Sequence, residues 1–229
     1  MKGLLRTLPL LLLLAAAEGR AQEPDQALPP ANLRIAVAGG LGVSYIRAGD
    51  LVTLVNGTSG ALERVADFRS AAEFFAAGTI PLTSAWMLKI EYAYLLASYS
   101  VGTSFGTGVA QYTLGAHLPT LILHRVLVSN PMYDLKAGAG VGFHVGTVSR
   151  SSFLLDDNFS ARGLGVVLDL EGDTAVSEHL FAFLDACLRW EWMGNLRDSQ
   201  GRGPAGPQGG AVTLNVFGPG AKIGVAYLF

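Results

Sequence analysis

Apolar residues alternate with small or polar residues along seven segments of the chain, with the period of two that is typical of β-strands. In the most regular of them, Tyr133, Leu135 and other apolar residues at odd positions alternate with Asp134, Lys136, His144 and four glycines. The seven segments are 33–45, 86–96, 111–122, 133–146, 163–170, 180–191 and 221–229. The pattern therefore predicts an all-β chain.

The charges within these strands all fall on one face. None of the seven more apolar faces carries a Lys, Arg, Asp or Glu, and every charge within the strands falls on the opposite faces, among glycines, alanines and other small residues. A soluble sandwich would cover its outer face with long polar side chains. In a transmembrane barrel the apolar face meets lipid, where a Lys or Arg at the midplane costs about 2–4 kcal/mol, and the inner side chains must fit a narrow tube. We therefore expect a transmembrane antiparallel up-and-down β-barrel. The alternative is a soluble lipocalin-like barrel with the same apolar residues turned inward.

The number of strands is expected to be eight, because single-chain bacterial barrels have an even number. Two places could supply the eighth strand. One is the short segment 51–55. The other is the segment 212–229, which Gly218-Pro219-Gly220 could divide into a hairpin.

The connections between the strands are less regular. The longest, 50–84, includes a stretch at 59–77 whose Leu62, Val65, Phe68, Ala72 and Phe75 lie near helical spacing. We expect one short helix there, either as a cap outside the membrane or as a plug in the barrel mouth. The segment 195–210 is rich in Gly and Pro and is expected to be a loop, and 150–160 is expected to be a polar connection.

Composition agrees with a membrane protein and the N-terminus predicts export. Half of the residues are hydrophobic and only 15% are charged. The best candidate for a spanning helix, 85–101, carries Lys89 and Glu91 near its middle, which is costly in lipid. Lys2 and Arg6 lie around the start of an apolar run at 8–17, and a small-x-small site ends at Ala21. We expect a signal peptide at 1–21, an N-terminal tail at 22–31 and a barrel domain at 32–229.

Charge and cysteine content exclude several other classes of protein. Residues 1–21 hold three of the 16 Lys and Arg and one of the 18 Asp and Glu, so the remaining chain has a net charge of −4. This acidic balance gives no sign of a nucleic-acid partner. The single cysteine, Cys187, excludes an internal disulfide framework and lies too far from the N-terminus to be a lipid anchor.

The candidate functional residues are the polar side chains on the inner face. They are Lys89, Glu91, His117, Asp134, Lys136, His144, Asp169, Asp185, Arg189, Glu191 and Lys222. Buried charges need partners, and an eight-stranded barrel has room for little more than its own side chains. We therefore interpret the set as a charge-balanced network that fills the tube, four basic against five acidic groups. The alternatives are an ion-selective pore and a site for a small polar ligand.

No catalytic, metal or cofactor site is predicted. His117 and His144 are expected on inner faces of adjacent strands, where two histidines and a carboxylate could bind a metal or act in acid–base chemistry. A barrel-borne lipid hydrolase would also need a suitable serine, and no His-x-Ser element lies on these strands. The alternating glycines around Gly140 do not form a phosphate loop, which needs a turn that enters a helix.

The C-terminal segment 221–229 carries the most specific signal. Phe229 is terminal, and Tyr227, Val225 and Ile223 precede it at alternate positions. This pattern resembles the terminal signature of small bacterial outer-membrane β-barrel proteins, and the glycine-alternating strand Ala137–His144 is similar to strands of that family. The resemblance extends over residues 33–229.

The resemblance implies an outer-membrane location in a Gram-negative bacterium, contact with outer-membrane lipid, and recognition of Ile223, Val225, Tyr227 and Phe229 by the barrel-assembly machinery. It does not imply one activity, since a fold hosts many functions. We expect a structural or surface-interaction role without enzymatic activity. The alternatives are a narrow channel or carrier for a small solute and a lipid-modifying barrel enzyme.

Overall fold

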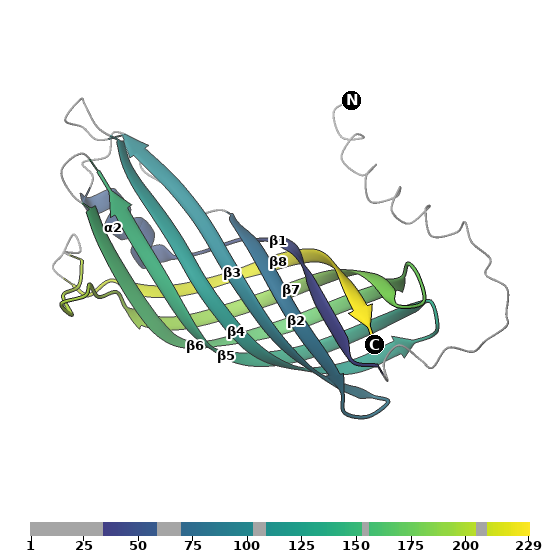
Figure 1. Ribbon diagram of the computed structural model, residues 1–229. Helices are drawn as coiled ribbons and strands as arrows, with labels where there is room; N and C mark the ends of the chain where they lie inside the picture. The colour runs from purple at the N-terminus through teal and green to yellow at the C-terminus, as the bar shows by residue number, and fades with distance from the viewer. Residues whose placement is uncertain (1–33, 59–69, 103–108, 153–155, 205–209) are drawn as a thin grey trace, which may run out of the picture.

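Eight antiparallel strands form a closed barrel in the computed structural model, which describes residues 34–58, 70–102, 109–152, 156–204 and 210–229 (Figure 1). Each strand pairs with its neighbours in chain order, and β1 pairs with β8 to close the ring. The strands are β1 (Ala36–Ser44), β2 (Ala71–Pro81), β3 (Trp86–Gly102), β4 (Val109–Ser129), β5 (Tyr133–Ser151), β6 (Asp156–Ala175), β7 (Leu180–Asn195) and β8 (Thr213–Leu228). The predicted fold class is confirmed.

The eighth strand is β2, and both places predicted for it were wrong. Residues 51–55 lie in the helix α2 (Gly49–Thr58), and Gly218-Pro219-Gly220 lies inside the continuous strand β8. Tyr45 donates a backbone hydrogen bond to the carbonyl of Pro219, so this proline remains part of the seam between β1 and β8.

The helix predicted at 59–77 was also misplaced. Residues 71–77 form the first part of β2, residues 59–69 lie outside the described part of the chain, and α2 precedes the predicted stretch. The outer face of β2 includes Ala72, Ala76 and Gly78, which give a weak strand pattern, while Ala72 and Phe75 happen to fit helical spacing. The predicted connection at 150–160 is also mostly strand, because β5 extends to Ser151 and β6 starts at Asp156.

The two ends of the barrel differ. Short turns join β2 to β3, β4 to β5 and β6 to β7 at the end where β8 finishes, which we call the turn end. The opposite end, which we call the loop end, holds α2 and the long connection between β7 and β8 (Figure 1). Strands β3 to β6 have 17 to 21 residues, whereas β1 and β2 have 9 and 11. The wall that β3 to β6 form therefore projects further at the loop end (Figure 1).

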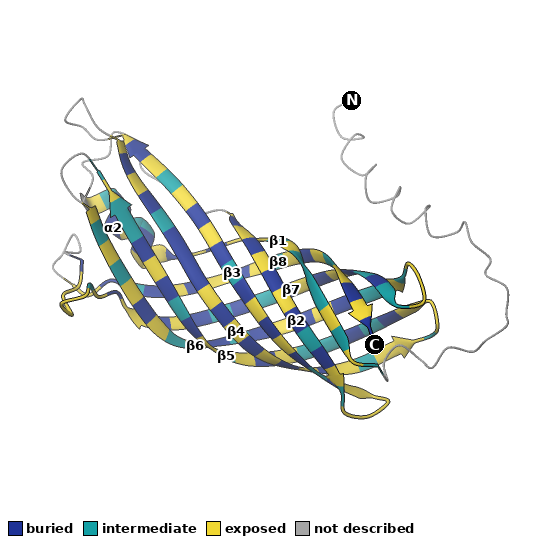
Figure 2. Ribbon diagram, viewed as in Figure 1, coloured by how far each residue is buried: buried dark blue, intermediate teal, exposed yellow. Residues whose placement is uncertain are grey.

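Buried and exposed residues alternate along every strand (Figure 2). The exposed face carries large apolar side chains, such as Leu41, Ile90, Val141, Leu164 and Ile223. Aromatic rings flank this apolar belt: Trp86, Tyr133, Tyr227 and Phe229 at the turn end, and Tyr45, Trp192 and Phe217 toward the loop end. Within the eight strands, the outward-facing charged residues are Arg125 near one end and Arg162 and Asp156 near the other.

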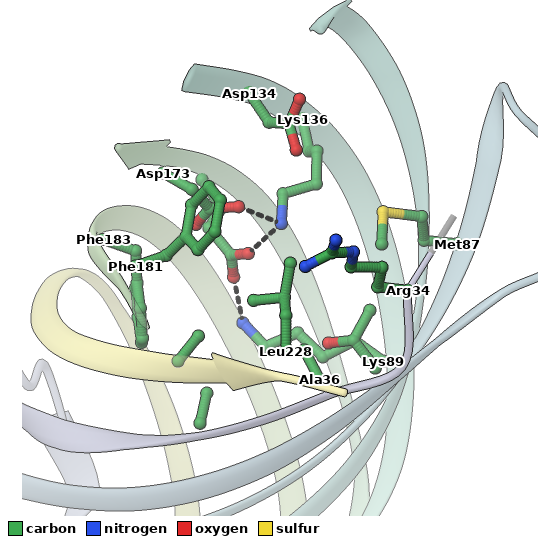
Figure 3. A pocket seen from close by; sticks show the side chains of 14 residues that line it. Arg34, Ala36, Met87, Lys89, Asp134, Lys136, Asp173, Phe181, Phe183 and Leu228 are labelled. Carbon is green, nitrogen blue, oxygen red and sulfur yellow. Dashed lines mark hydrogen bonds and ion pairs between the residues drawn. The ribbon is translucent and has the colours of Figure 1, made fainter. Parts of the chain in front are cut away.

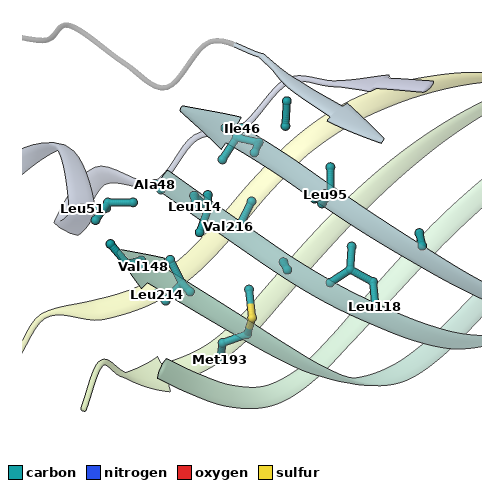
Figure 4. Close-up of a cluster of buried hydrophobic side chains, with 14 of the residues drawn as sticks. Ile46, Ala48, Leu51, Leu95, Leu114, Leu118, Val148, Met193, Leu214 and Val216 are labelled. Carbon is teal, nitrogen blue, oxygen red and sulfur yellow. The ribbon is translucent and has the colours of Figure 1, made fainter. Parts of the chain in front are cut away.

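The lumen is divided into two layers. The loop-end half is packed with apolar side chains from the strands and from α2, including Leu51, Leu114, Leu118, Met193 and Leu214 (Figure 4). The middle and the turn-end half hold buried charged side chains beside Phe75, Phe181 and Phe183. Among the described residues, no helix has the length and apolar character needed to cross a membrane.

Candidate functional site: the charged network in the lumen

The charged residues reach one another because they occupy alternate, inward-facing positions on neighbouring strands. Two opposite-charge pairs lie directly across from each other in the sheet: Lys136 of β5 faces Glu171 of β6, and Asp185 of β7 faces Lys222 of β8. Cross-strand pairs of this kind stabilise a sheet. Lys89 and Glu91 are neighbours on one face of β3, Lys136 also reaches Asp173 of the adjacent strand, and the contacts of Lys222 with Glu91 and of Arg189 with Glu73 cross the lumen.

Lys89 of β3 lies at the centre of the network. Its Nζ is 2.6 Å from Glu171 Oε2, 3.0 Å from Glu91 Oε2 and 3.3 Å from Asp185 Oδ2. Asp169 is also within 3.6 Å. The side chain is 2% exposed, and because an unpaired buried ammonium is very costly, these carboxylates are what allow it to remain charged.

Lys222 and Arg189 link the same carboxylates to β2. Lys222 Nζ lies 2.8 Å from Glu91 Oε2 and 3.0 Å from Asp185 Oδ2, and 5.3 Å from the ring centroid of Phe75. Arg189 donates two hydrogen bonds to the carboxylate of Glu73, at 2.7 and 2.6 Å. This bidentate geometry fixes the planar guanidinium better than a single contact would.

A pocket of about 30 Å³ opens beside the network at the turn end (Figure 3). Lys136 Nζ lies in its wall, 2.6 Å from Glu171 Oε1 and 2.5 Å from Asp173 Oδ2. Asp134, Arg34 and the rings of Phe181 and Phe183 also line it. This volume accommodates one or two water molecules.

Two buried histidines each contact a carboxylate. His124 Nε2 lies 2.7 Å from Asp169 Oδ2. His144 Nδ1 contacts Glu191 Oε2, and its Nε2 lies 3.1 Å from Thr120 Oγ1. The second set joins a hydroxyl, an imidazole and a carboxylate in the order used by nucleophilic hydrolases. However, Thr120, His144 and Glu191 are all buried, and the pocket beside Glu191 measures only about 10 Å³. A substrate cannot reach this hydroxyl in the described arrangement.

His124, Asp169 and Glu171 also offer ligand atoms within 4.8 Å of one another. Lys89 and Lys136 contact these two carboxylates, so two ammonium groups already occupy the positions from which a cation would be bound. The geometry favours an ion-pair network over a metal site.

The structure places ten of the eleven predicted residues in the lumen and His117 outside. The ten are Lys89, Glu91, Asp134, Lys136, His144, Asp169, Asp185, Arg189, Glu191 and Lys222, all buried. His117 is exposed on the outer face of β4, and its Nδ1 is 2.6 Å from the hydroxyl of Tyr92. The prediction reversed the two faces of this strand, because the apolar residues Tyr112, Leu114 and Leu118 belong to the packed lumen and not to the lipid-facing belt.

Sequence reasoning missed four residues of the network: Glu73, His124, Glu171 and Asp173. Glu73 was hidden in the segment predicted as helix, and the other three lie just beyond strand ends placed too early, at Ile122 and Leu170. The alternation of inward-facing and outward-facing residues continues past Ile122 and Leu170, and this pattern could have placed the three residues in the lumen. With these residues, and with Arg34 in the pocket wall, the middle and turn-end half of the described lumen holds eight carboxylates against five Lys and Arg, so acidic groups exceed basic ones by more than expected.

The architecture is that of the small outer-membrane β-barrels. The first comparison is with the attachment invasion locus protein Ail of Yersinia pestis, in complex with the heparin analogue sucrose octasulfate. The TM-score is 0.52 at 10% identity, over 86% of this chain and 98% of that one. Neisserial surface protein A gives a TM-score of 0.50 at 13% identity, over 85% and 97%. At such identities the likeness concerns the fold alone. No family model and no curated protein matches the sequence.

Proposed function

We propose that this chain is an integral outer-membrane protein of a Gram-negative bacterium with a structural or surface-interaction role and no enzymatic activity. The observation that carries the proposal is the apolar belt around a closed barrel. Large apolar side chains such as Leu41, Val141 and Ile223 are more than half exposed. The few outward charges of the described strands are Arg125 toward the turn end and Asp156 and Arg162 in the loop-end half. In water this belt would be a large exposed apolar surface, whereas in a bilayer it is solvated.

The orientation follows from the lengths of the connections. Outer-membrane barrels have short periplasmic turns and longer extracellular loops. The turn end, with Phe229, is therefore assigned to the periplasm and α2 to the cell surface. Ile223, Val225 and Tyr227 are exposed on β8 next to β1, and the exposed Phe229 directly follows the strand. We infer that the assembly machinery reads these residues during insertion.

A transport role is less well supported, because the described lumen is filled at both levels. Apolar side chains pack the loop-end half, and ion pairs join opposite walls below them. Ions entering from the turn end would have to break these pairs and then cross the packed apolar layer.

Two measurements test the proposal. The outer-membrane fraction is run on a detergent gel, boiled and unboiled, and purified protein is inserted into planar bilayers. We expect a mobility shift on boiling, recovery in the membrane fraction, and no reproducible conductance steps. Recovery in the soluble periplasm without a shift would reject the membrane assignment. Stable conductance steps would replace the structural role with that of a channel.

A further inference from the structure

The outer face of the projecting wall is polar but uncharged over most of its area. Above the apolar belt, strands β3 to β6 turn hydroxyl and amide side chains outward, which we call the hydroxyl face: Ser98, Ser100, Gln111, Thr113, Thr147, Ser149, Ser151, Asn158 and Ser160. Some of these groups bond one another across strands, such as Gln111 Nε2 to Ser98 Oγ at 3.2 Å and Ser149 Oγ to Asn158 Oδ1 at 2.5 Å. The face therefore presents a regular array of neutral donors and acceptors.

A second polar group lies directly below this face, inside the apolar belt. His117 pairs in register with Tyr94, four residues along the strands from the pair of Thr113 and Ser98 and on the same face of the sheet. Its Nδ1 bonds the Tyr92 hydroxyl at 2.6 Å, and its ring centroid is 4.9 Å from that of Tyr94. Both His117 and Tyr92 are exposed, beside apolar neighbours such as Ile90 and Leu121. Polar groups at this position favour a partner that also offers hydrogen bonds, because bare hydrocarbon offers none.

The positively charged side chain of Arg162 lies near His117 on the same outer face. His117 pairs with Val145, and Val145 pairs with Arg162 of β6, so His117 and Arg162 lie in one row across three strands. With strands about 4.8 Å apart, their backbones are roughly 10 Å from each other, within reach of one ligand. Arg162 is exposed, and no ion pair joins its guanidinium to another described residue.

We propose that this outer face of β3 to β6 binds one phosphorylated glycolipid of the outer leaflet. The saccharide lies on the hydroxyl face, a phosphate pairs with Arg162, and the linkage to the acyl chains contacts His117 and Tyr92. The acyl chains lie on the apolar belt below. The proposal rests on the proposed membrane location.

The distribution of chemical groups selects this ligand over other candidates. Sugar hydroxyls match an array of neutral donors and acceptors, and phosphate matches a guanidinium, which binds it with two parallel hydrogen bonds. A diacyl phospholipid would satisfy Arg162 and the belt but would leave the hydroxyl face uncovered. A protein partner would be expected to meet aromatic anchors at the centre of the patch, and Ser and Thr residues occupy that place instead.

The test uses the full folded chain in neutral detergent micelles and two fluorescently labelled probes. One is a purified rough-type lipopolysaccharide, with a phosphorylated saccharide and acyl chains, and the other is phosphatidylglycerol. We expect the wild-type protein to bind the glycolipid at least about tenfold more tightly. Arg162→Gln should weaken glycolipid binding about tenfold, as expected for loss of one charge-assisted hydrogen-bond pair. The double variant Ser98→Ala/Thr113→Val should weaken glycolipid binding and leave phosphatidylglycerol binding unchanged.

Arg125→Gln is the matched control, because Arg125 is exposed on the same outer face at the opposite end of β4. It should bind the glycolipid like the wild type. Equal affinity for the two probes, or equal losses in Arg125→Gln and Arg162→Gln, would overturn the inference. The mobility shift on boiling confirms that each variant is folded. If the shift is present and affinities do not change, only the glycolipid site fails; if the wild type shows no shift, the membrane assignment itself fails.

Discussion

Arg189 shows how single residues hold the lumen together. Its guanidinium is buried and paired with both oxygens of Glu73. The variant Arg189→Gln would leave the Glu73 carboxylate buried without its main partner, which costs about 3–5 kcal/mol of unfolding free energy. Urea unfolding of the refolded protein, followed by tryptophan fluorescence, measures this change.

The control for Arg189 is Arg150→Gln. Arg150 forms an ion pair with Asp157, but these side chains are 22% and 33% exposed. Solvent screens such a pair, so its loss should cost about 1 kcal/mol or less. Equal losses in the two variants would show that burial does not set the strength of the network.

Gly40 has a different role, because it allows β1 and β8 to approach. A Cβ on Gly40 would lie 2.1 Å from the carbonyl oxygen of Ile223 and 2.7 Å from the Cα of Gly224. We expect Gly40→Ala to weaken the closing seam and to lower the yield of the heat-modifiable form on refolding. Gly78→Ala, where a Cβ meets nothing within 4 Å, should refold like the wild type.

Asp198, in the connection between β7 and β8, titrates outside the barrel. Its carboxylate accepts backbone hydrogen bonds from Gln200 and Arg202 and pairs with the Arg202 side chain, and these contacts lower its pKa. A lowered pKa means that the turn is stabilised at neutral pH and loses this contribution only when the pH falls through the folded-state pKa, below the usual value of about 3.9. A carboxyl chemical-shift titration should show the midpoint below that value, and Arg202→Gln should move it upward.

Two residues show where sequence reasoning succeeds and where it stops. Lys89 could be placed inside because its strand has one clearly apolar face. His117 could not be placed, because both faces of β4 carry apolar residues. The outer face meets lipid, and the inner face packs in the loop-end half of the lumen. Alternation alone does not tell which of two apolar faces is the interior.

At the scale of elements, β2 and α2 were the difficult parts. Phe74 and Ile80 mark the outer face of β2, but alanine and glycine occupy its other outward positions, so the strand signal is diluted. The helix has only 10 residues, too few for a distinct period. Strands with strong contrast between their faces, such as β5 and β7, were predicted from sequence, and their partners then followed from chain order.

The helix α2 packs against the apolar layer of the loop end through Leu51, which Figure 4 shows, and through Leu54 and Val55. The three side chains are at most 3% exposed. Leu54→Asp places a charge in this apolar layer and should release the helix without opening the barrel wall. Hydrogen exchange should become faster in α2 and stay slow in β3 to β6. Thr53→Asp, on the exposed side of the same helix, should change neither. Faster exchange throughout the strands in Leu54→Asp would mean that α2 is part of the barrel's folding core.

At the scale of the whole molecule, Cys187 allows the orientation to be tested. It is buried in the lumen, so it should not react with a maleimide until the protein is boiled. In this background, Thr53→Cys at the loop end should be labelled on intact cells by a membrane-impermeant maleimide. Ser177→Cys at the turn end should be labelled only after the outer membrane is permeabilised. The reverse pattern would invert the proposed orientation.

The unequal strand lengths give the barrel a slanted rim. In the plane of a membrane the protein would therefore have two sides, with the tall wall of β3 to β6 on one and the short strands β1 and β2 on the other. A neighbour that approaches from the tall side meets strands that extend well beyond the apolar belt, whereas one that approaches from the other side meets strands that end sooner. A neighbouring membrane protein would therefore contact different surfaces on the two sides of the barrel, and its contacts would depend on the side from which it approaches.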